Sequence, residues 1–185
     1  MSRAVFLDRD GVLNELVDDP EDERPEGPLH PDDVRLVPGA ARAAKELHDA
    51  GFLLIAASNQ PAAAKGKVDG DQLRAVHARV VELLAVQGVF LDDWRYCLHR
   101  AEDGCDCRKP KPGLLLDAAA AHGIDLSRSW FVGDADTDVQ AGRAAGVKTV
   151  LVEHPGSAHR RTGAHVADVT ATDLQQAVEA VLRDL

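Results

Sequence analysis

The chain has 185 residues, of which 45% are hydrophobic and 28% are charged, a composition that is ordinary for a globular protein with a buried core. Lys and Arg number 21 while Asp and Glu number 31, and the resulting net charge of −10 argues against a general nucleic-acid-binding protein. No apolar run reaches the roughly eighteen residues of a membrane span, and charges interrupt the first ten residues. We therefore expect no membrane span and no secretory signal, and a monomeric protein in the cytoplasm.

Short apolar runs alternate with helical patterns along the chain. The runs predict strands at residues 4–7, 52–57, 94–98, 130–132 and 147–152. The helical patterns fall at residues 39–50, 71–87, 112–122, 137–145 and 173–184. This alternation is typical of an α/β fold. We expect residues 1–185 to form a single domain, a Rossmann-like three-layer sandwich with a mostly parallel sheet and helices on both faces.

Two segments interrupt the alternation. Residues 15–33 are acidic and rich in proline, and they fit either a solvated loop or a flap over an active site. Residues 154–165 contain glycine, histidine and two arginines. We expect the second segment to be a surface loop with solvated arginines.

Polar side chains follow three of the predicted strands at the point where each strand ends. Asp8 follows the first strand, Ser58 the second, and Asp134 the strand at residues 130–132. Because the carboxyl ends of parallel strands share one edge of a sheet, we expect these side chains to converge. The backbone N–H groups after Ser58, at a predicted strand–helix junction, could hold phosphoryl oxygens.

Asp8 and Asp10 are carboxylates two positions apart, and Gly11 allows the chain to bend after them. One could attack phosphorus while the other moves a proton, although such a pair on its own is more often a simple acidic turn at a strand end. Asp134, with Asp138 nearby, adds further carboxylates. Clustered carboxylates repel one another unless a cation lies among them, and oxygen ligands beside a phosphorylated substrate favour Mg²⁺.

A cysteine-rich loop offers a second kind of metal site. Its candidate ligands are Cys97, His99, Cys105 and Cys107. Three thiolates and one imidazole complete the tetrahedral set of a structural Zn²⁺ site, and the alternative is a group of unrelated thiols. The most basic cluster of the chain follows at once and consists of Arg108, Lys109 and Lys111. Such a cluster suits an anionic group bound near the carboxylates.

Four segments resemble, in chain order, the sequence motifs of the haloacid dehalogenase superfamily. They are FLDRDG at residues 6–11, SNQ at 58–60, CRKP at 107–110 and VGD at 132–134. The resemblance covers about residues 4–152, and the cysteine-rich loop makes the chain similar to the branch with heptose bisphosphate and histidinol-phosphate phosphatases. It implies a phosphatase without a large cap domain that uses catalytic Mg²⁺ and a zinc-bound loop and acts on a small phosphorylated metabolite.

The resemblance also implies a role for each matching residue. Asp8 would be the nucleophile that becomes an aspartyl phosphate, and Asp10 the general acid and then the base. The phosphoryl group would be stabilised by Ser58 and Lys109. The substrate would be bound by Asn59, Gln60, Lys65 and Arg108. The Mg²⁺ ligands would be Asp8, the main-chain carbonyl of Asp10, and Asp134.

The substrate stays open at this point. The step Lys65-Gly66 favours cleavage of the 7-phosphate of D-glycero-D-manno-heptose 1,7-bisphosphate, whereas the short gap between His99 and Cys105 resembles the histidinol-phosphate enzymes. A receiver-like signalling domain would also gather carboxylates, a hydroxyl and a lysine around Mg²⁺. Asp10 argues against a receiver, because a second acid beside the nucleophile serves turnover, and a zinc loop has no purpose there.

Overall fold

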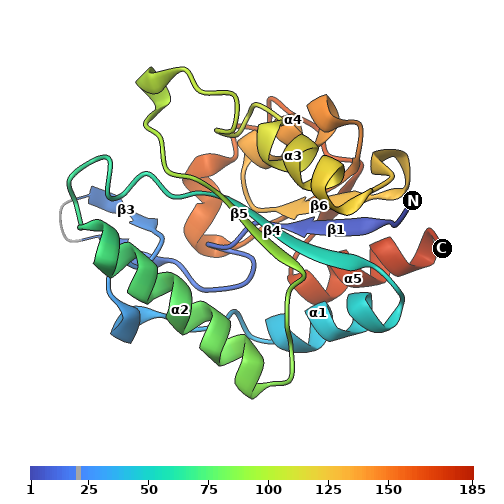
Figure 1. The fold of residues 1–185 in the computed structure, drawn as a ribbon, viewed down its shortest axis with the longest axis horizontal. Coiled ribbons are helices and arrows are strands. Elements are labelled where there is room, and N and C mark those ends of the chain that lie inside the picture. Colours follow the sequence, from blue (N-terminus) through green and yellow to red (C-terminus); the bar gives the residue numbers. More distant parts are fainter. Residues whose placement is uncertain (20–21) are drawn as a thin grey trace.

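The computed structural model describes residues 1–19 and 22–185. Within these residues the centre is a six-stranded parallel sheet (Figure 1). Its strands, from one edge to the other, are β5 (Asp93–Cys97), β4 (Leu53–Asn59), β1 (Ala4–Leu7), β6 (Trp130–Gly133), β7 (Lys148–Val152) and β8 (Val169–Ala171). After β1 the chain forms the β2–β3 hairpin, whose antiparallel strands are β2 (Val17–Asp19) and β3 (Asp22–Glu26).

Helices cover both faces of the sheet (Figure 1). One face carries α1 (Ala40–Asp49), α2 (Gly70–Val86) and α5 (Leu174–Arg183). The other face carries α3 (Gly113–His122) and α4 (Asp136–Ala145). The predicted α/β sandwich with a parallel sheet and no large cap domain is therefore confirmed in the described part of the chain. None of the helices in that part is long and apolar enough to cross a bilayer.

Strand β1 shows how the sheet divides the core in two. Its side chains are all fully buried. Val5 and Leu7 pack with the core under α1, α2 and α5, while Ala4 and Phe6 pack with the core under α3 and α4. Successive residues of a strand point to opposite faces, so a sheet covered on both sides requires a continuous apolar run. Burial of each large side chain contributes about 1.5–3 kcal/mol, which anchors the strand from which Asp8 emerges.

Strand β4 is longer than predicted. The apolar run suggests an end before Ser58, but β4 includes Ser58 and Asn59 and stays paired with β5 there. Turns then occupy residues 61–66, and the next helix, α2, begins at Gly70. The predicted strand–helix junction at Ser58 is therefore wrong. Pairing with β5 holds these polar residues extended, although their sequence does not favour a strand.

The two segments that interrupt the alternation are both structured. Residues 15–33 contain the β2–β3 hairpin, and residues 154–165 contain a short 3₁₀ helix, Pro155–Arg160, that packs against β3. Residues 154–165 therefore lie at the surface, as predicted, but Pro155–Arg160 form a 3₁₀ helix rather than an irregular loop. Strand β8 was not predicted either, because its three residues are too few to give a periodic pattern.

Candidate active site

Asp8 follows directly after β1, at the carboxyl edge of the sheet. Its backbone N–H donates to the carbonyl of Val132 on β6 at 2.9 Å, which extends the pairing of the two strands to this residue. Its carboxylate is buried and lies 2.9 Å from Nζ of Lys109. A buried carboxylate without such a partner would be strongly disfavoured. Asp8 is therefore fixed at the sheet edge with its charge compensated.

Asp134 and Asp138 reach the same place from the end of β6 and from the first turn of α4. Carboxylate oxygens of Asp8, Asp134 and Asp138 lie within 4.8 Å of one another. Burial, together with the two neighbouring carboxylates, raises the pKa of Asp134 to about 8. Burial and Asp8 also raise the pKa of Asp138 to about 6, against the opposing effect of Lys109. Such a group is favourable only when protons or a cation reduce the repulsion.

The chemistry of this group fits a divalent cation. Asp134 is fully buried, and neither of its carboxylate oxygens has a hydrogen-bond partner among the described residues. Gly11, at a φ of +93°, leaves the space for this carboxylate, because any side chain there would collide with it. Asp138 instead accepts two backbone N–H groups at 3.1 Å and lies 2.6 Å from Nζ of Lys109. Asp8 and Asp134 are thus the carboxylates best placed to hold Mg²⁺.

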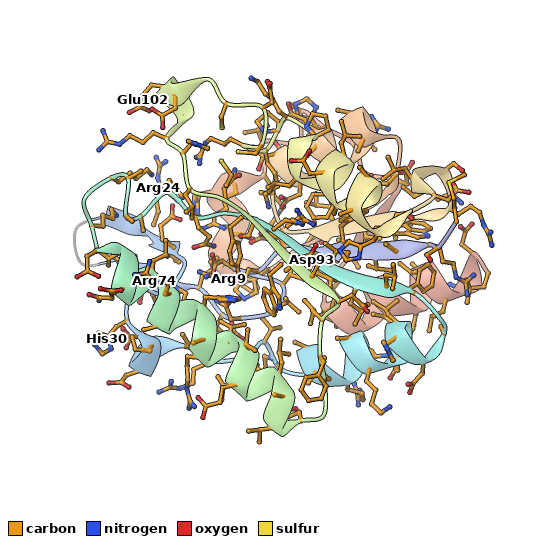
Figure 2. All side chains as sticks on the ribbon, viewed as in Figure 1. Arg9, Arg24, His30, Arg74, Asp93 and Glu102 are labelled. Atoms are coloured by element: carbon orange, nitrogen blue, oxygen red, sulfur yellow. The ribbon has the colours of Figure 1, made fainter. Side chains whose placement is uncertain are left out.

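The carboxylate of Asp10 is held separately, by three side chains. Arg9 donates to it from Nε and Nη2 at 3.0 Å each, Asn14 at 2.9 Å and Gln60 at 2.6 Å. Burial alone would raise the pKa of Asp10, but these donors outweigh burial and lower it. Arg9 itself is buried inside the fold (Figure 2). With its carboxylate engaged in this way, Asp10 is compatible with the predicted metal contact through its main-chain carbonyl.

Of the two candidate lysines, Lys109 reaches the site. Its side chain is 3% exposed, and Nζ lies 2.9 Å from Asp8 and 2.6 Å from Asp138. Burial would lower the pKa of Lys109, but the two carboxylates raise it above the ordinary value, so the ammonium stays charged. Asn59 holds the backbone N–H and carbonyl of Lys109 with hydrogen bonds of 3.0 and 3.1 Å. Lys111 is half exposed and contacts the cysteine-rich loop instead.

A cavity of about 190 Å³ lies beside Asp10. Its lining includes three of the residues predicted to bind substrate, Asn59, Gln60 and Lys65. The β2–β3 hairpin and the turn after it contribute Glu26 and Gly27, so the structure favours the flap over the solvated loop for residues 15–33. Arg108 is not one of the described residues that line the cavity. Its guanidinium donates to the backbone carbonyl of His99 at 3.1 Å. The role of Arg108 in substrate binding stays a prediction.

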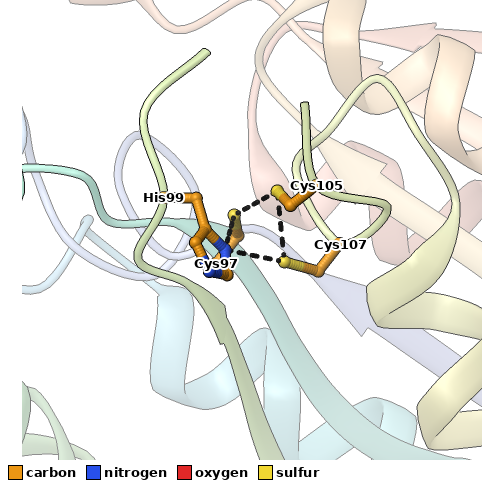
Figure 3. A group of neighbouring side chains, drawn as sticks. All are labelled: Cys97, His99, Cys105 and Cys107. Atoms are coloured by element: carbon orange, nitrogen blue, oxygen red, sulfur yellow. Dashed lines mark hydrogen bonds between the residues drawn. The ribbon is translucent and has the colours of Figure 1, made fainter. Parts of the chain in front are cut away.

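The predicted ligands of the cysteine-rich loop converge on one point (Figure 3). Sγ of Cys97 lies 3.6 Å from both Nδ1 of His99 and Sγ of Cys105. Cys107 closes the ring, with its Sγ 3.3 Å from the same His99 nitrogen and 3.5 Å from the Cys105 sulfur. Tetrahedral ligands at zinc bond lengths of roughly 2.0–2.3 Å stand about 3.3–3.8 Å apart. The four side chains therefore fit a closed structural zinc site.

Comparisons with known proteins show the family to which this chain belongs. A family model described as HAD-hydrolase-like matches residues 106–180. The crystal structure of a D,D-heptose 1,7-bisphosphate phosphatase from B. bronchiseptica, complexed with magnesium and phosphate, has a TM-score of 0.86, with 31% identity and 99% coverage of each chain. The D-glycero-beta-D-manno-heptose-1,7-bisphosphate 7-phosphatase of Pseudomonas aeruginosa is 42% identical over 83% of each protein. The chain belongs to the heptose bisphosphate phosphatase family of haloacid-dehalogenase-like hydrolases.

A second relative extends the match over nearly the whole chain. The D-glycero-D-manno-heptose-1,7-bisphosphate 7-phosphatase of Thermosynechococcus vestitus is 39% identical over 98% of this chain and 96% of its own length. The predicted resemblance to the haloacid dehalogenase superfamily is therefore confirmed. The individual roles of the site residues in this heptose bisphosphate phosphatase homologue remain predictions.

Sequence reasoning missed part of the site of this heptose bisphosphate phosphatase homologue. Asp138 is predicted as a member of the carboxylate cluster, but its ion pair with Lys109 at 2.6 Å is not predicted. No sequence signal marks Arg160, which arrives through tertiary contacts. Its Nη1 lies 3.7 Å from Asp134 and its Nη2 donates to Glu26 at 2.8 Å. The prediction of solvated arginines in residues 154–165 is thus wrong for Arg160, whose side chain is 19% exposed.

Proposed function

We propose that this protein is a Mg²⁺-dependent phosphatase that hydrolyses the 7-phosphate of D-glycero-D-manno-heptose 1,7-bisphosphate through an aspartyl phosphate. The observation that carries the reaction is the buried Asp8 carboxylate, held between Lys109 and the carboxylates of Asp134 and Asp138. The substrate is supported by the relatives named for heptose bisphosphate at 39% and 42% identity over most of both chains.

The first step is transfer of the phosphoryl group to Asp8. A carboxylate oxygen of Asp8 attacks phosphorus, and the bond from phosphorus to the sugar oxygen breaks. Lys109, whose Nζ lies 2.9 Å from Asp8, stabilises the negative charge on the phosphoryl oxygens. Oγ of Ser58 accepts a hydrogen bond from Gln60 at 3.0 Å, which leaves its own proton for a phosphoryl oxygen. Phosphoryl transfer depends mainly on such positioning and charge neutralisation.

Asp10 moves a proton in each step. Before the first step it takes up a proton, because the charge of an incoming phosphate raises the pKa of a nearby carboxyl. It then donates this proton to the departing sugar oxygen. In the second step the ionised Asp10 accepts a proton from the water that attacks the aspartyl phosphate, so that inorganic phosphate leaves and Asp8 is regenerated. The donors Arg9, Asn14 and Gln60 favour the ionised form.

We also propose two metal ions. Asp8, the main-chain carbonyl of Asp10 and Asp134 would hold Mg²⁺, which supplies the positive charge that lets an anionic carboxylate and an anionic phosphate approach each other. Cys97, His99, Cys105 and Cys107 would hold zinc. Because Lys109 follows Cys107 by two positions, a fixed loop also fixes the approach of Lys109 to Asp8.

The test is the rate of phosphate release from a panel of substrates. We expect the highest kcat/KM for heptose 1,7-bisphosphate, with loss of the phosphate at C7, compared with sugar monophosphates and histidinol phosphate. Asp8→Asn, which keeps the size of the side chain, is the matched control and should release no phosphate. Preferred turnover of histidinol phosphate would move the assignment to that substrate. No release from any substrate by folded protein supplied with Mg²⁺ and Zn²⁺ would contradict the proposal.

A further inference from the structure

The β2–β3 hairpin lies directly against the general acid. A Cβ atom placed on Gly27, just after β3, would stand 2.6 Å from Oδ2 of Asp10, so the backbone approaches this carboxylate as closely as glycine permits. Glu26 and Gly27 also line the cavity beside Asp10. The position of the hairpin therefore sets the shape of the cavity and the surroundings of the proton donor.

One arginine joins this hairpin to the acidic cluster. Nη2 of Arg160 donates to Oε2 of Glu26 at 2.8 Å, and Nη1 of the same guanidinium lies 3.7 Å from Oδ2 of Asp134. Asp134 is fully buried, whereas the side chain of Glu26 is 48% exposed. The guanidinium thus spans from the cavity wall to the buried carboxylate. A planar group with several donors is suited to hold two carboxylates in a fixed relation.

The helix that carries Arg160 is itself anchored. Nε2 of His154 lies 2.7 Å from the carboxylate of Glu15, two positions before β2. Nδ1 of the same ring accepts a hydrogen bond from the backbone N–H of Gly156 at 3.1 Å. Since Nδ1 is an acceptor, Nε2 carries the hydrogen and donates to Glu15. Arg161 donates to the carbonyl of His154 at 3.0 Å. Residues 154–161 therefore contact the β2–β3 hairpin and the residues just before it at two places, through His154 with Glu15 and through Arg160 with Glu26.

We propose that Arg160 is a positioning residue that holds the β2–β3 hairpin against the catalytic edge of the sheet and so sets the substrate cavity. The guanidinium contacts Glu26, at the end of β3, and Asp134, at the end of β6, and so connects the hairpin to the sheet. Loss of Arg160 should loosen the hairpin, widen the cavity and weaken substrate binding more than it slows the chemical step. Only the kinetic part of the test rests on the proposed function.

The direct test is hydrogen–deuterium exchange at residues 24–29, where every residue except Pro25 and Pro28 has a backbone N–H. Arg160→Gln and Glu26→Gln should each raise the exchange rate roughly two- to fivefold, the range for one partly exposed charge pair. The double variant should exchange no faster than either single variant, because both remove the same contact. Arg24→Gln, at an exposed arginine of β3, is the matched control and should leave the rate unchanged.

Two outcomes would overturn the proposal. Unchanged exchange at residues 24–29 in both Arg160→Gln and Glu26→Gln would show that the pair does not hold the hairpin. Faster exchange in β1 as well, with a lower Tm, would show that Arg160 stabilises the whole fold rather than the hairpin. Because this measurement needs no substrate, it stands even if heptose bisphosphate is the wrong substrate.

A kinetic measurement separates positioning from catalysis. Arg160→Gln should raise KM by a larger factor than it lowers kcat for the preferred phosphorylated substrate, and Arg160→Lys should recover part of the loss. A fall in kcat at constant KM would overturn the positioning role. If no substrate is turned over by the unmodified protein, the proposed function fails while the exchange result still decides the role of Arg160.

Discussion

At the residue scale, burial distinguishes two lysines that stand two positions apart. Lys109 is enclosed and contacts the carboxylates of Asp8 and Asp138, whereas Lys111 is half exposed and contacts the carboxylate of Asp106. An ion pair in water contributes little, but a charge held in a buried site acts strongly on the charge that develops during a reaction. The two lysines should therefore differ sharply in their importance for turnover.

Alanine substitution of each lysine tests this difference. Lys109→Ala should lower kcat/KM by roughly a hundredfold or more, because the phosphoryl oxygens lose a preorganised cation. Lys111→Ala serves as the matched control and should stay within about twofold, since its ion pair is exposed. Phosphate-release kinetics, with Tm measured beside them, check the result. Equal losses in two folded variants would mean that Lys109 does not act on the phosphoryl group.

At the element scale, the cysteine-rich loop is a connection whose shape a metal can fix. It runs from the end of β5 through Cys107 to Lys109, and the segment contains little regular structure beyond a short 3₁₀ turn. A structural zinc ion supplies folding energy where helices and strands do not. The loop should therefore control the position of Lys109, while the buried sheet folds without it.

Removal of zinc tests that dependence. We expect one zinc ion per chain by elemental analysis of protein purified without added metal. Cys105→Ala should lose the zinc and most of the activity, but keep the far-ultraviolet circular dichroism of the α/β core, because the other elements do not rely on the loop. Ser127→Ala, in the short connection Leu126–Arg128 that holds none of the proposed metal ligands, is the control for a substitution in a connecting segment. Full activity in zinc-free protein would contradict this account.

The elements that sequence predicts well are those with a strong apolar pattern. Strands such as β1 and β6 are continuous apolar runs buried on both faces, so their existence and the convergence of Asp8 and Asp134 at the sheet edge could be predicted. The cysteine spacing predicted the cluster that the structure brings together. In each case the signal lies in neighbouring residues of the chain.

The elements that sequence missed depend on contacts between distant segments. The β2–β3 hairpin is polar, and it is held in part by Arg160, which stands far along the chain. Ser58 remains in β4 because β5 pairs with it, not because of its own propensity. Arg160 itself is drawn inward by the buried Asp134 carboxylate. None of these contacts leaves a periodic or composition signal, so a single sequence could not reveal them.

At the scale of the whole molecule, this acidic protein gathers the buried carboxylates of Asp8, Asp134 and Asp138 at one edge of its sheet, where they repel one another. An aspartate carboxyl has an ordinary pKa of 3.8, whereas burial and its two neighbours raise the pKa of Asp134 to about 8 in the folded protein. Between these values the folded state binds a proton that the unfolded state does not. The contribution of Asp134 to the free energy of unfolding therefore falls as pH rises through this window.

This linkage predicts that Mg²⁺ stabilises the protein more at higher pH. Near pH 6 Asp134 is protonated, so the proton competes with Mg²⁺ for the carboxylate. Near pH 8 more of the carboxylate is ionised and able to bind Mg²⁺. The gain in Tm on adding Mg²⁺ should be about 2–4 °C larger at pH 8 than at pH 6. Differential scanning calorimetry measures both gains, and Asp134→Asn should abolish them. Equal gains at the two pH values would contradict a metal site at this carboxylate.

The central claim is that Asp8 carries the phosphoryl group, and trapping it is the most direct measurement. Asp10→Asn should slow hydrolysis of the aspartyl phosphate, so an aryl phosphate, with its good leaving group, should load the enzyme. Acid quenching, borohydride reduction and trypsin digestion then allow mass spectrometry of peptide 4–9, in which Asp8 is the only acidic side chain. We predict reduction at Asp8. An unmodified peptide 4–9 from a variant that releases the aryl alcohol, or reduction in peptide 10–35, which trypsin leaves whole because Pro25 follows Arg24, would contradict the account.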